Sequence, residues 1–434
     1  MTTSSEKARR LVQYLNTVEP MDDLLQNVLP NLDDLELIKN TDTVPSPLSW
    51  TQHAMDKRIG FIEKGMKLEL EYLTGRKQFT DVEGLRGNIE NYIGMTQVPT
   101  GIIGPLLVHG TQSKGDYFVP MATSEGALVA SYNRGAKACR MSGGITSVCL
   151  TEAVQRAPLF KFNNLSEAGA FATWVLQQLA AFRDIVSRTS RFAKLDDMKL
   201  NMQGNELILV FEYTTGDAAG QNMVTVCTNA ICQYIVANTP TSPRYWFIES
   251  NYSGDKKATA VSFVNVRGKK VTAEITMPRK VVNDHLRSTP EMIAAYWQSS
   301  SVAAVQSGSI GIQGHFANGL TAIFMATGQD VACVSEASVG VTRMEVNEAG
   351  DLYATVTLPN MIVGTVGGGT GLPTQRECLR IMTCEGTGKA RRFAEICGAT
   401  VLAGELSIAA SIASGDFAKS HMLFGRKHAS APKA

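Results

Sequence analysis

A stretch of about ninety residues, 158–248, constrains the fold of this chain more than any other feature. Its pattern indicates a helix over 166–187, strands over 192–202 and 206–213, a second helix over 218–236 and a strand over 244–249. This α-β-β-α-β order is compatible with a small α+β domain, for which we expect a ferredoxin-like arrangement, inserted into a larger one. We therefore expect an α+β fold, in which a large helix-rich domain carries a small inserted α+β domain.

The flanking sequence predicts the larger domain in two parts, 61–157 and 249–424. Its second part is expected to contain a hairpin around Arg267-Gly268, Ala/Ser/Gly-rich helices over 291–327, a hairpin near 347–351 and a last helix around 403–413. Helices so poor in large side chains suit a buried central helix or a subunit interface. Prolines divide 1–60 into short helices, so we expect an N-terminal helical arm there, and a disordered basic tail over 425–434.

Composition excludes several classes of protein. The 41 basic and 40 acidic side chains nearly cancel, so the chain has no overall attraction for nucleic acid or membranes. Residues 1–7 lack the apolar core of a signal peptide and no apolar run reaches the length of a membrane span, which predicts a soluble cytoplasmic protein. The eight cysteines contain no Cys-x-x-Cys pair and the six histidines lack ligand spacing, so neither disulfides nor a metal site are expected.

The triplet Asp255-Lys256-Lys257 precedes a nearly uncharged, β-branched run, 258–266. A half-buried strand of that composition would turn one lysine toward the interior, where a cation beside carboxylates suits the stabilisation of a developing oxyanion. Taken alone, the triplet is explained more simply by solvated lysines at the start of an ordinary hairpin.

Isolated polar residues in apolar surroundings are further candidates. Glu125 lies in a small-residue segment, where an enclosed carboxyl group keeps its proton more readily, as a general acid requires. Asp330 follows an uncharged helix, and His315, Asn318 and His421 lie in equally apolar stretches. A helix-terminal carboxylate in water and hydrogen-bonded core histidines are the alternatives.

Two glycine-rich loops join predicted strands to predicted helices. The loop 364–370 exposes backbone N–H groups that can hold phosphate, although a tight turn explains it as well. The second loop, 214–220, contains Asp217, which is expected to cap the helix that follows. Arg191, between Ser190 and Phe192 at the preceding helix-to-strand junction, is either a phosphate contact near that loop or a surface residue.

In combination, these motifs resemble a known family. Six runs, taken in order, are similar to the catalytic domain of 3-hydroxy-3-methylglutaryl-coenzyme A (HMG-CoA) reductases. They are Glu90-Asn91-Tyr92-Ile93-Gly94, 121–126, 255–257, 328–330, 364–370 and Lys419-Ser420-His421-Met422. Glu90 to Gly94 and the small domain resemble the class I, NADP-linked branch. The resemblance implies NADPH-dependent reduction of HMG-CoA to mevalonate by two hydride transfers, in a homodimer or homotetramer with active sites at the subunit interface.

The resemblance also implies residue roles. Lys256 matches the lysine that stabilises the oxyanion, Glu125 the acid that protonates the aldehyde oxygen, Asp330 the carboxylate between them, and His421 the acid that protonates departing coenzyme A. Substrate contacts are implied for Arg156, Lys257, Asn251, Asn318, Ser131, Asn133, Arg134, Lys137, Arg287, His315 and Ser420. NADPH contacts are implied for Ser190, Arg191, Phe192, Asp217, Gly220, Gln221, Asn222, Gly367, Gly368 and Gly369, and no metal is implied.

The sequence departs from the family pattern at several positions. The family's Asp-Ala-Met-Gly-Met-Asn reads Asp217-Ala218-Ala219-Gly220-Gln221-Asn222, and no Lys or Arg lies between Ser288 and Gly314, where the family has a substrate-binding lysine. Reduction of a related acyl-coenzyme A therefore stays open. A non-catalytic coenzyme A-binding homologue predicts the loss of one or more of the four catalytic residues, and all four are present.

Overall fold

The structure, a computed structural model, describes residues 12–13, 43–418 and 422, and the statements below concern these residues. In the larger part of the molecule the elements are α4 (Gln52–Met66), η2 (Glu83–Leu85), β1 (Thr100–Gly110), β2 (Lys114–Ala122), α5 (Leu128–Met141), β3 (Ile145–Arg156), η3 (Ala260–Phe263), β8 (Gly268–Met277), α9 (Arg279–Val281), η4 (Val282–Leu286), α10 (Pro290–Ser307), α11 (Phe316–Thr327), η5 (Val331–Cys333), α12 (Val334–Ala337), β9 (Val341–Val346), β10 (Leu352–Met361), η6 (Gly368–Gly371), α13 (Pro373–Ile381) and α14 (Ala390–Ala413).

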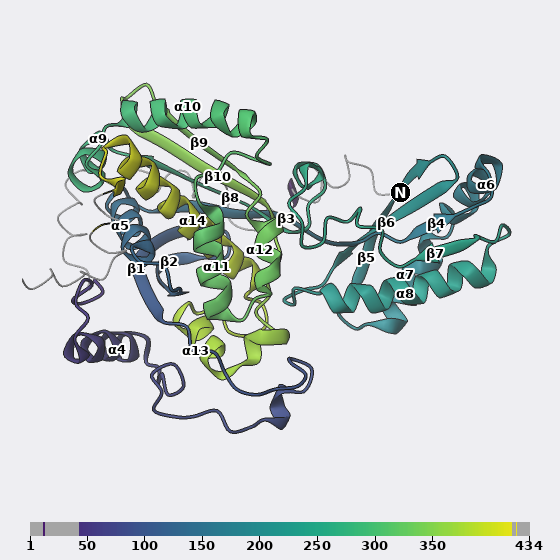
Figure 1. Ribbon diagram of the computed structural model, residues 1–434, viewed down its shortest axis with the longest axis horizontal. Helices are drawn as coiled ribbons and strands as arrows, with labels where there is room; N and C mark the ends of the chain where they lie inside the picture. Colours follow the sequence, from purple (N-terminus) through teal and green to yellow (C-terminus); the bar gives the residue numbers. More distant parts are fainter. Residues whose placement is uncertain (1–11, 14–42, 419–421, 423–434) are drawn as a thin grey trace, which may run out of the picture.

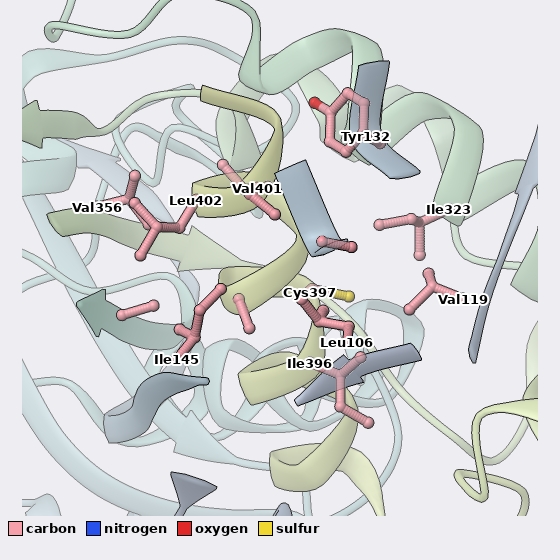
Figure 2. Close-up of a cluster of buried hydrophobic side chains, with 14 of the residues drawn as sticks. Leu106, Val119, Tyr132, Ile145, Ile323, Val356, Ile396, Cys397, Val401 and Leu402 are labelled. Carbon is pink, nitrogen blue, oxygen red and sulfur yellow. The ribbon is translucent and has the colours of Figure 1, made fainter. Parts of the chain in front are cut away.

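The larger part is built on an open sheet in the order β2-β1-β3-β8-β10-β9, in which only the β1–β3 pairing is parallel. Helix α14 packs against this sheet and is surrounded by α5, α10 and α11 (Figure 1). It is the one helix among the described residues with the length and hydropathy to cross a membrane, but 83% of its most apolar 18-residue stretch is buried inside the protein. Figure 2 shows its side chains Ile396, Cys397, Val401 and Leu402 among Leu106, Val119, Ile145, Ile323 and Val356.

The smaller part contains β4 (Leu159–Lys161), α6 (Leu165–Val175), α7 (Leu179–Thr189), β5 (Lys194–Gln203), β6 (Glu206–Thr214), α8 (Gln221–Asn238) and β7 (Tyr245–Phe247). Its antiparallel strands are arranged β7-β4-β6-β5, the order of a ferredoxin-like sheet. It has its own core, formed by side chains such as Phe160, Phe171, Phe182, Phe211 and Ile231. The α+β prediction with a ferredoxin-like insertion is confirmed.

Strand β3 belongs to both sheets and joins the two parts (Figure 1). Its first residues pair with β1 and β8, whereas Val154, Gln155 and Arg156 pair with Tyr213, Glu212 and Phe211 of β6. Only Ala157 and Pro158 separate β3 from β4, and the carbonyl of Pro158 accepts a hydrogen bond from the Leu209 amide at 3.0 Å. Strands β3 and β4 therefore run along β6 as one nearly continuous line.

The predicted elements agree with the structure in some places and not in others. The helices over 291–327 and the hairpin near 347–351 are confirmed by α10, α11 and the β9–β10 pair. The predicted helix 166–187 is two helices, α6 and α7. Their different directions allow Phe171 of α6 and Phe182 of α7 to enter the same core. The last helix starts at Ala390 rather than near residue 403.

The predicted strand over 258–266, and with it the hairpin at Arg267-Gly268, is wrong. The segment folds as a turn and the 3-10 helix η3, because the residues before and after it are tied into a buried ion cluster described below. The domain limits at 61, 158, 249 and 425 remain a prediction from sequence. Most of the expected N-terminal arm and the tail lie outside the described residues.

Candidate active site

A cavity of about 2870 Å³ collects most of the candidate residues. It is lined by Glu125, Ser131, Asn133, Arg134, Lys137, Gly220, Gln221, Asn222, Lys256, Arg287, His315, Asn318, Asp330, Gly367, Gly368 and Gly369. Four of them lie along α5, and the others come from turns and helix starts of both parts of the molecule, so the cavity lies where the inserted domain meets the larger one. His421 and Ser420 lie outside the described residues.

Lys256 and Asp330 form an ion pair at the cavity wall. The ammonium nitrogen of Lys256 lies 2.8 Å from a carboxylate oxygen of Asp330. The hydrogen bond to Asp330 raises the pKa of Lys256, so the ammonium form is retained at neutral pH. The expectation that a strand turns a lysine into the interior is wrong: Lys256 stands in a turn, and its side chain is 44% exposed.

Glu125 lies in the turn between β2 and α5, and it contacts Asn318 rather than Asp330. The Asn318 side-chain amide donates to both carboxylate oxygens of Glu125, at 3.1 and 3.0 Å. Glu125 is exposed to the cavity and not enclosed as its apolar sequence context predicted, because the small residues around it leave the side chain uncovered. Ala127, two residues later, has a left-handed backbone with φ of 71°, which directs the chain from this turn into α5.

His315 lines the same cavity from the N-terminus of α11. Its Nδ1 lies 2.8 Å from Oε1 of Glu405, a buried side chain of α14 that also accepts the amides of Gly314 and His315. Burial alone would raise the pKa of Glu405, but these hydrogen bonds outweigh it and lower the pKa. The Nε2 atom of His315 is buried without a hydrogen-bond partner.

Three loops converge to form the part of the cavity expected to hold the cofactor. The Thr365 amide donates to the carbonyl of Asp217 at 2.8 Å, and the side chain of Gln329 exchanges two hydrogen bonds with the backbone of Gly364. Helix α8 begins after Gly220, whose missing side chain leaves the first amides without a side-chain acceptor. This pattern offers N–H groups to an anion at the start of a long helix.

Gly367 and Gly368 add open space to this part of the cavity. Both have positive φ, 77° and 55°, and a Cβ atom built on either would meet nothing within 4 Å. Gly364, in contrast, approaches the β6–α8 loop so closely that a Cβ would lie 2.6 Å from the Ala219 backbone. The residues present therefore fit a phosphate-bearing nucleotide cofactor, since the loops meet each other without side chains and leave room beside the helix.

Asp217 was predicted to cap the helix that follows it, and it does not. Its carboxylate accepts hydrogen bonds from the amides of Gly388 and Ala390 at 2.7 and 3.1 Å, across to the start of α14. The prediction was wrong because α8 starts three residues later than expected, at Gln221. Asp217 ties the inserted domain to the larger one.

Several predicted contacts are not at the cavity wall. Ser190, Arg191 and Phe192 do not line the cavity. They lie near the β6–α8 loop, since Lys194, which follows them, pairs with Thr214 at the end of β6. Asn251 and Lys257 are exposed; Lys257 stands in the same turn as Lys256, and Asn251 begins the turn before it.

Arg156 is buried away from the cavity and bonded to two carboxylates. Its guanidinium lies 2.9 Å from Asp255 and 3.4 Å from Glu249. Arg267 also holds Asp255, at 2.7 Å, and pairs with the buried Glu336. Burial alone would raise the pKa of Asp255, but the two guanidinium groups outweigh it and lower the pKa.

Arg267, Glu336 and Glu405 were not predicted from the sequence. Each glutamate is a lone carboxylate in an otherwise uncharged run, the same signal that singled out Glu125. Arg267 was taken for a hairpin residue.

Comparison with known proteins finds relatives that match most of this chain. A sequence model of hydroxymethylglutaryl-coenzyme A reductase matches residues 54–426. The chain is 43% identical over 380 residues to 3-hydroxy-3-methylglutaryl-coenzyme A reductase from Pyrococcus abyssi, covering 86% of this chain and 93% of that protein. It is 42% identical over 394 residues to the Aeropyrum pernix reductase, covering 87% and 93%. The solved class II reductase of Streptococcus pneumoniae bound to NADPH has the same fold, with a TM-score of 0.68 at 19% identity over 84% of this chain and 100% of that chain.

Proposed function

Because this chain belongs to the hydroxymethylglutaryl-coenzyme A reductase family, an oxidoreductase family that reduces HMG-CoA in the mevalonate pathway, we propose that it uses NADPH and two successive hydride transfers to form mevalonate and coenzyme A. One observation carries the proposal. The Lys256–Asp330 ion pair and the Glu125–Asn318 pair line one cavity with the glycine-rich loop and the start of α8.

Lys256 stabilises the oxyanion that develops as each hydride reaches the carbonyl carbon. A retained ammonium group, held in place by Asp330, presents its remaining N–H groups to the cavity. A fixed cation aimed at charge that appears only in the transition state lowers the barrier without strengthening ground-state binding.

Glu125 delivers the proton to the aldehyde oxygen in the second reduction. Asn318 fixes the orientation of its carboxyl group through the hydrogen bonds described above. His421 protonates the departing thiolate when the hemithioacetal collapses; a histidine suits this step because its reference pKa, about 6.5, lies below that of a thiol, about 8.5.

NADPH, when bound, supplies the hydride. The amides at the start of α8 and the backbone of Gly367 to Gly369 hold its phosphates, and Arg191 meets the 2′-phosphate. The pneumococcal class II reductase was solved bound to NADPH, which supports this choice of nucleotide.

Coenzyme A binds on the other side of the cavity, where Arg134, Lys137 and Arg287 supply positive charge. Ser131 and Asn133 contribute polar groups from α5, and His315 lies near the thioester. Burial lowers the pKa of Arg134, but an arginine stays charged throughout the physiological range.

The active assembly is a homodimer or homotetramer in the cytoplasm, with active sites completed by the neighbouring subunit. Helix α10 supports this, because it is rich in small residues and exposes Met292, Val302 and Val305. Light scattering of the active enzyme tests it, and an active monomer would contradict it.

The function is tested by following nicotinamide absorbance with HMG-CoA and with NADPH or NADH in turn. We expect oxidation of NADPH that requires HMG-CoA, with mevalonate as the product. Acyl-coenzyme A thioesters that lack the 3-hydroxyl and 3-methyl groups serve as the comparison, because the absence of Lys and Arg over 288–314 favours a relaxed acyl specificity. Folded protein that binds coenzyme A but oxidises neither nucleotide would instead be a non-catalytic homologue.

A further inference from the structure

The backbone of Lys256 is in the left-handed region, with φ of 56°. A residue with a β-carbon rarely adopts this conformation unless its surroundings hold it there, and such positions gather at functional sites. On the cavity side Lys256 is exposed and is held through its side chain, by Asp330, which leaves its backbone conformation free. The restraint comes from beneath the turn.

Glu336, in the short helix α12, holds the Lys256 backbone from that side. It is fully buried, and its Oε1 accepts the Lys256 amide at 3.1 Å. Asp330, which binds the ammonium group of the same lysine, lies only six residues earlier in the chain. One short segment therefore holds both ends of Lys256.

Arg267 fixes the residue before Lys256. Its guanidinium is buried, with one terminal nitrogen on Glu336 and the other 2.7 Å from Asp255. Its backbone amide donates to the side chain of Asn360 at 3.0 Å, which anchors the arginine to the end of β10. The planar guanidinium thus joins two carboxylates on either side of the Lys256 turn.

We propose that Glu336 and Arg267 are positioning residues for Lys256: they hold the Asp255–Lys256 turn so that the ammonium group faces the reacting carbonyl. Neither lines the cavity, so both act through Lys256. The inference rests on the proposed catalytic role of Lys256.

The test compares Glu336→Gln with Glu395→Gln. Glu395, in α14, is a matched control because it is equally buried and accepts the amides of Gln112 and Ser113 at 2.9 Å, but it does not line the cavity and lies under the β1–β2 turn. We expect Glu336→Gln to lower kcat about a hundredfold through displacement of Lys256. The KM for HMG-CoA should stay within about twofold, because ground-state binding is not changed. Glu395→Gln should lose stability and keep kcat.

A second measurement does not depend on activity. Pulse acetylation followed by mass spectrometry gives the reactivity of Lys256 relative to exposed Lys280. Release of the turn separates Lys256 from Asp330, so the ratio should rise in Glu336→Gln and stay unchanged in Glu395→Gln. Arg267→Lys should raise it as well, because an ammonium group cannot bridge both carboxylates as a guanidinium does; this variant replaces Glu336→Gln if the latter does not fold.

The double variant Arg267→Met with Glu336→Gln separates positioning from stability. Removing both charges of a buried pair avoids an unpaired charge, so the stability should recover relative to Glu336→Gln. If kcat recovers with it, the pair is only structural and the inference is wrong; an unchanged kcat and acetylation ratio in Glu336→Gln would also overturn it. A wild-type protein without HMG-CoA reduction would defeat the proposed function instead, and the acetylation ratio would still decide whether Glu336 positions Lys256.

Discussion

The carboxylate of Asp217, in the inserted domain, accepts a hydrogen bond of 3.1 Å from the backbone amide of Ala390 at the first turn of α14. Replacing it with alanine removes a cap and an inter-domain contact together. We expect Asp217→Ala to lower the free energy of unfolding by about 1 kcal/mol and to raise the KM for NADPH. Asn164→Ala, which removes the N-cap of α6, should cost similar stability without changing this KM. Urea unfolding and initial rates measure both; equal KM values would mean that Asp217 does not shape the cofactor site.

The two lysines of the triplet should differ in their kinetics. Lys256→Ala removes a cation that acts on transition-state charge, so kcat should fall by about 10² to 10³-fold. Lys257 is exposed and donates to the carbonyl of Asp255. As an implied substrate contact it acts on HMG-CoA in the ground state, so Lys257→Ala should mainly raise the KM for HMG-CoA, by about fivefold. Steady-state kinetics with saturating NADPH distinguish them, and interchanged phenotypes would reverse the assignment.

The alkaline limb of the pH profile should depend on Asp330. Its hydrogen bond raises the pKa of Lys256, so the charged pair is complete below the ordinary lysine pKa and is lost as the pH rises through the raised value. Asp330→Asn removes the main cause of the shift. The alkaline decline of kcat should therefore begin at lower pH in this variant, whereas Asp351→Asn, far from any catalytic lysine contact, should leave it in place. A profile that does not move would show that Lys256 does not control this limb.

Cofactor choice should depend on Arg191. The residue is exposed, with its guanidinium carbon 5.8 Å from the centre of the Phe192 ring, and is free to meet a phosphate. Arg191→Ala should raise the KM for NADPH about tenfold and leave that for NADH unchanged. Arg188→Ala, an exposed arginine of α7 paired with Asp184, is the control. Loss of both nucleotides to the same extent would contradict a 2′-phosphate contact.

His421 should matter for only one half of the reaction. Only collapse of the hemithioacetal expels a thiolate that needs a proton donor. His421→Gln should strongly reduce turnover of HMG-CoA while reduction of added mevaldehyde, the aldehyde that the second hydride transfer reduces, continues. Both substrates are compared at saturating NADPH, with folding confirmed by circular dichroism; equal losses would exclude the leaving-group role.

The sequence predicted elements whose pattern is local. Helices α10 and α11 and the β9–β10 hairpin follow from periodicity and turn residues, and the ferredoxin-like order follows from the succession of elements. The segment 258–266 did not follow its β-branched composition, because the ion cluster of Asp255, Arg267 and Glu336 is formed by residues up to 81 positions apart. Strand propensity is weak enough for such contacts to override it.

The candidate site was likewise predicted only in part: its charged residues were recognised, but their partners were not. Glu125 and Asp330 stand out because each is charged in an apolar setting, and Lys256 because its charged triplet precedes an uncharged run; the structure places all three at one cavity. The partners of these residues were harder to predict. That Glu125 contacts Asn318, and that Asp217 reaches α14, depends on how loops from distant parts of the chain meet.

The nearly continuous line of β3 and β4 has a consequence for any attempt to produce the inserted domain alone. A polypeptide beginning at Pro158 would lack Val154, Gln155 and Arg156, and would leave the backbone of Phe211, Glu212 and Tyr213 unpaired on one side of β6. An open strand edge of this kind is a template for pairing with another chain. The smallest piece expected to stay monomeric therefore begins at or before Val154, within a strand of the larger domain.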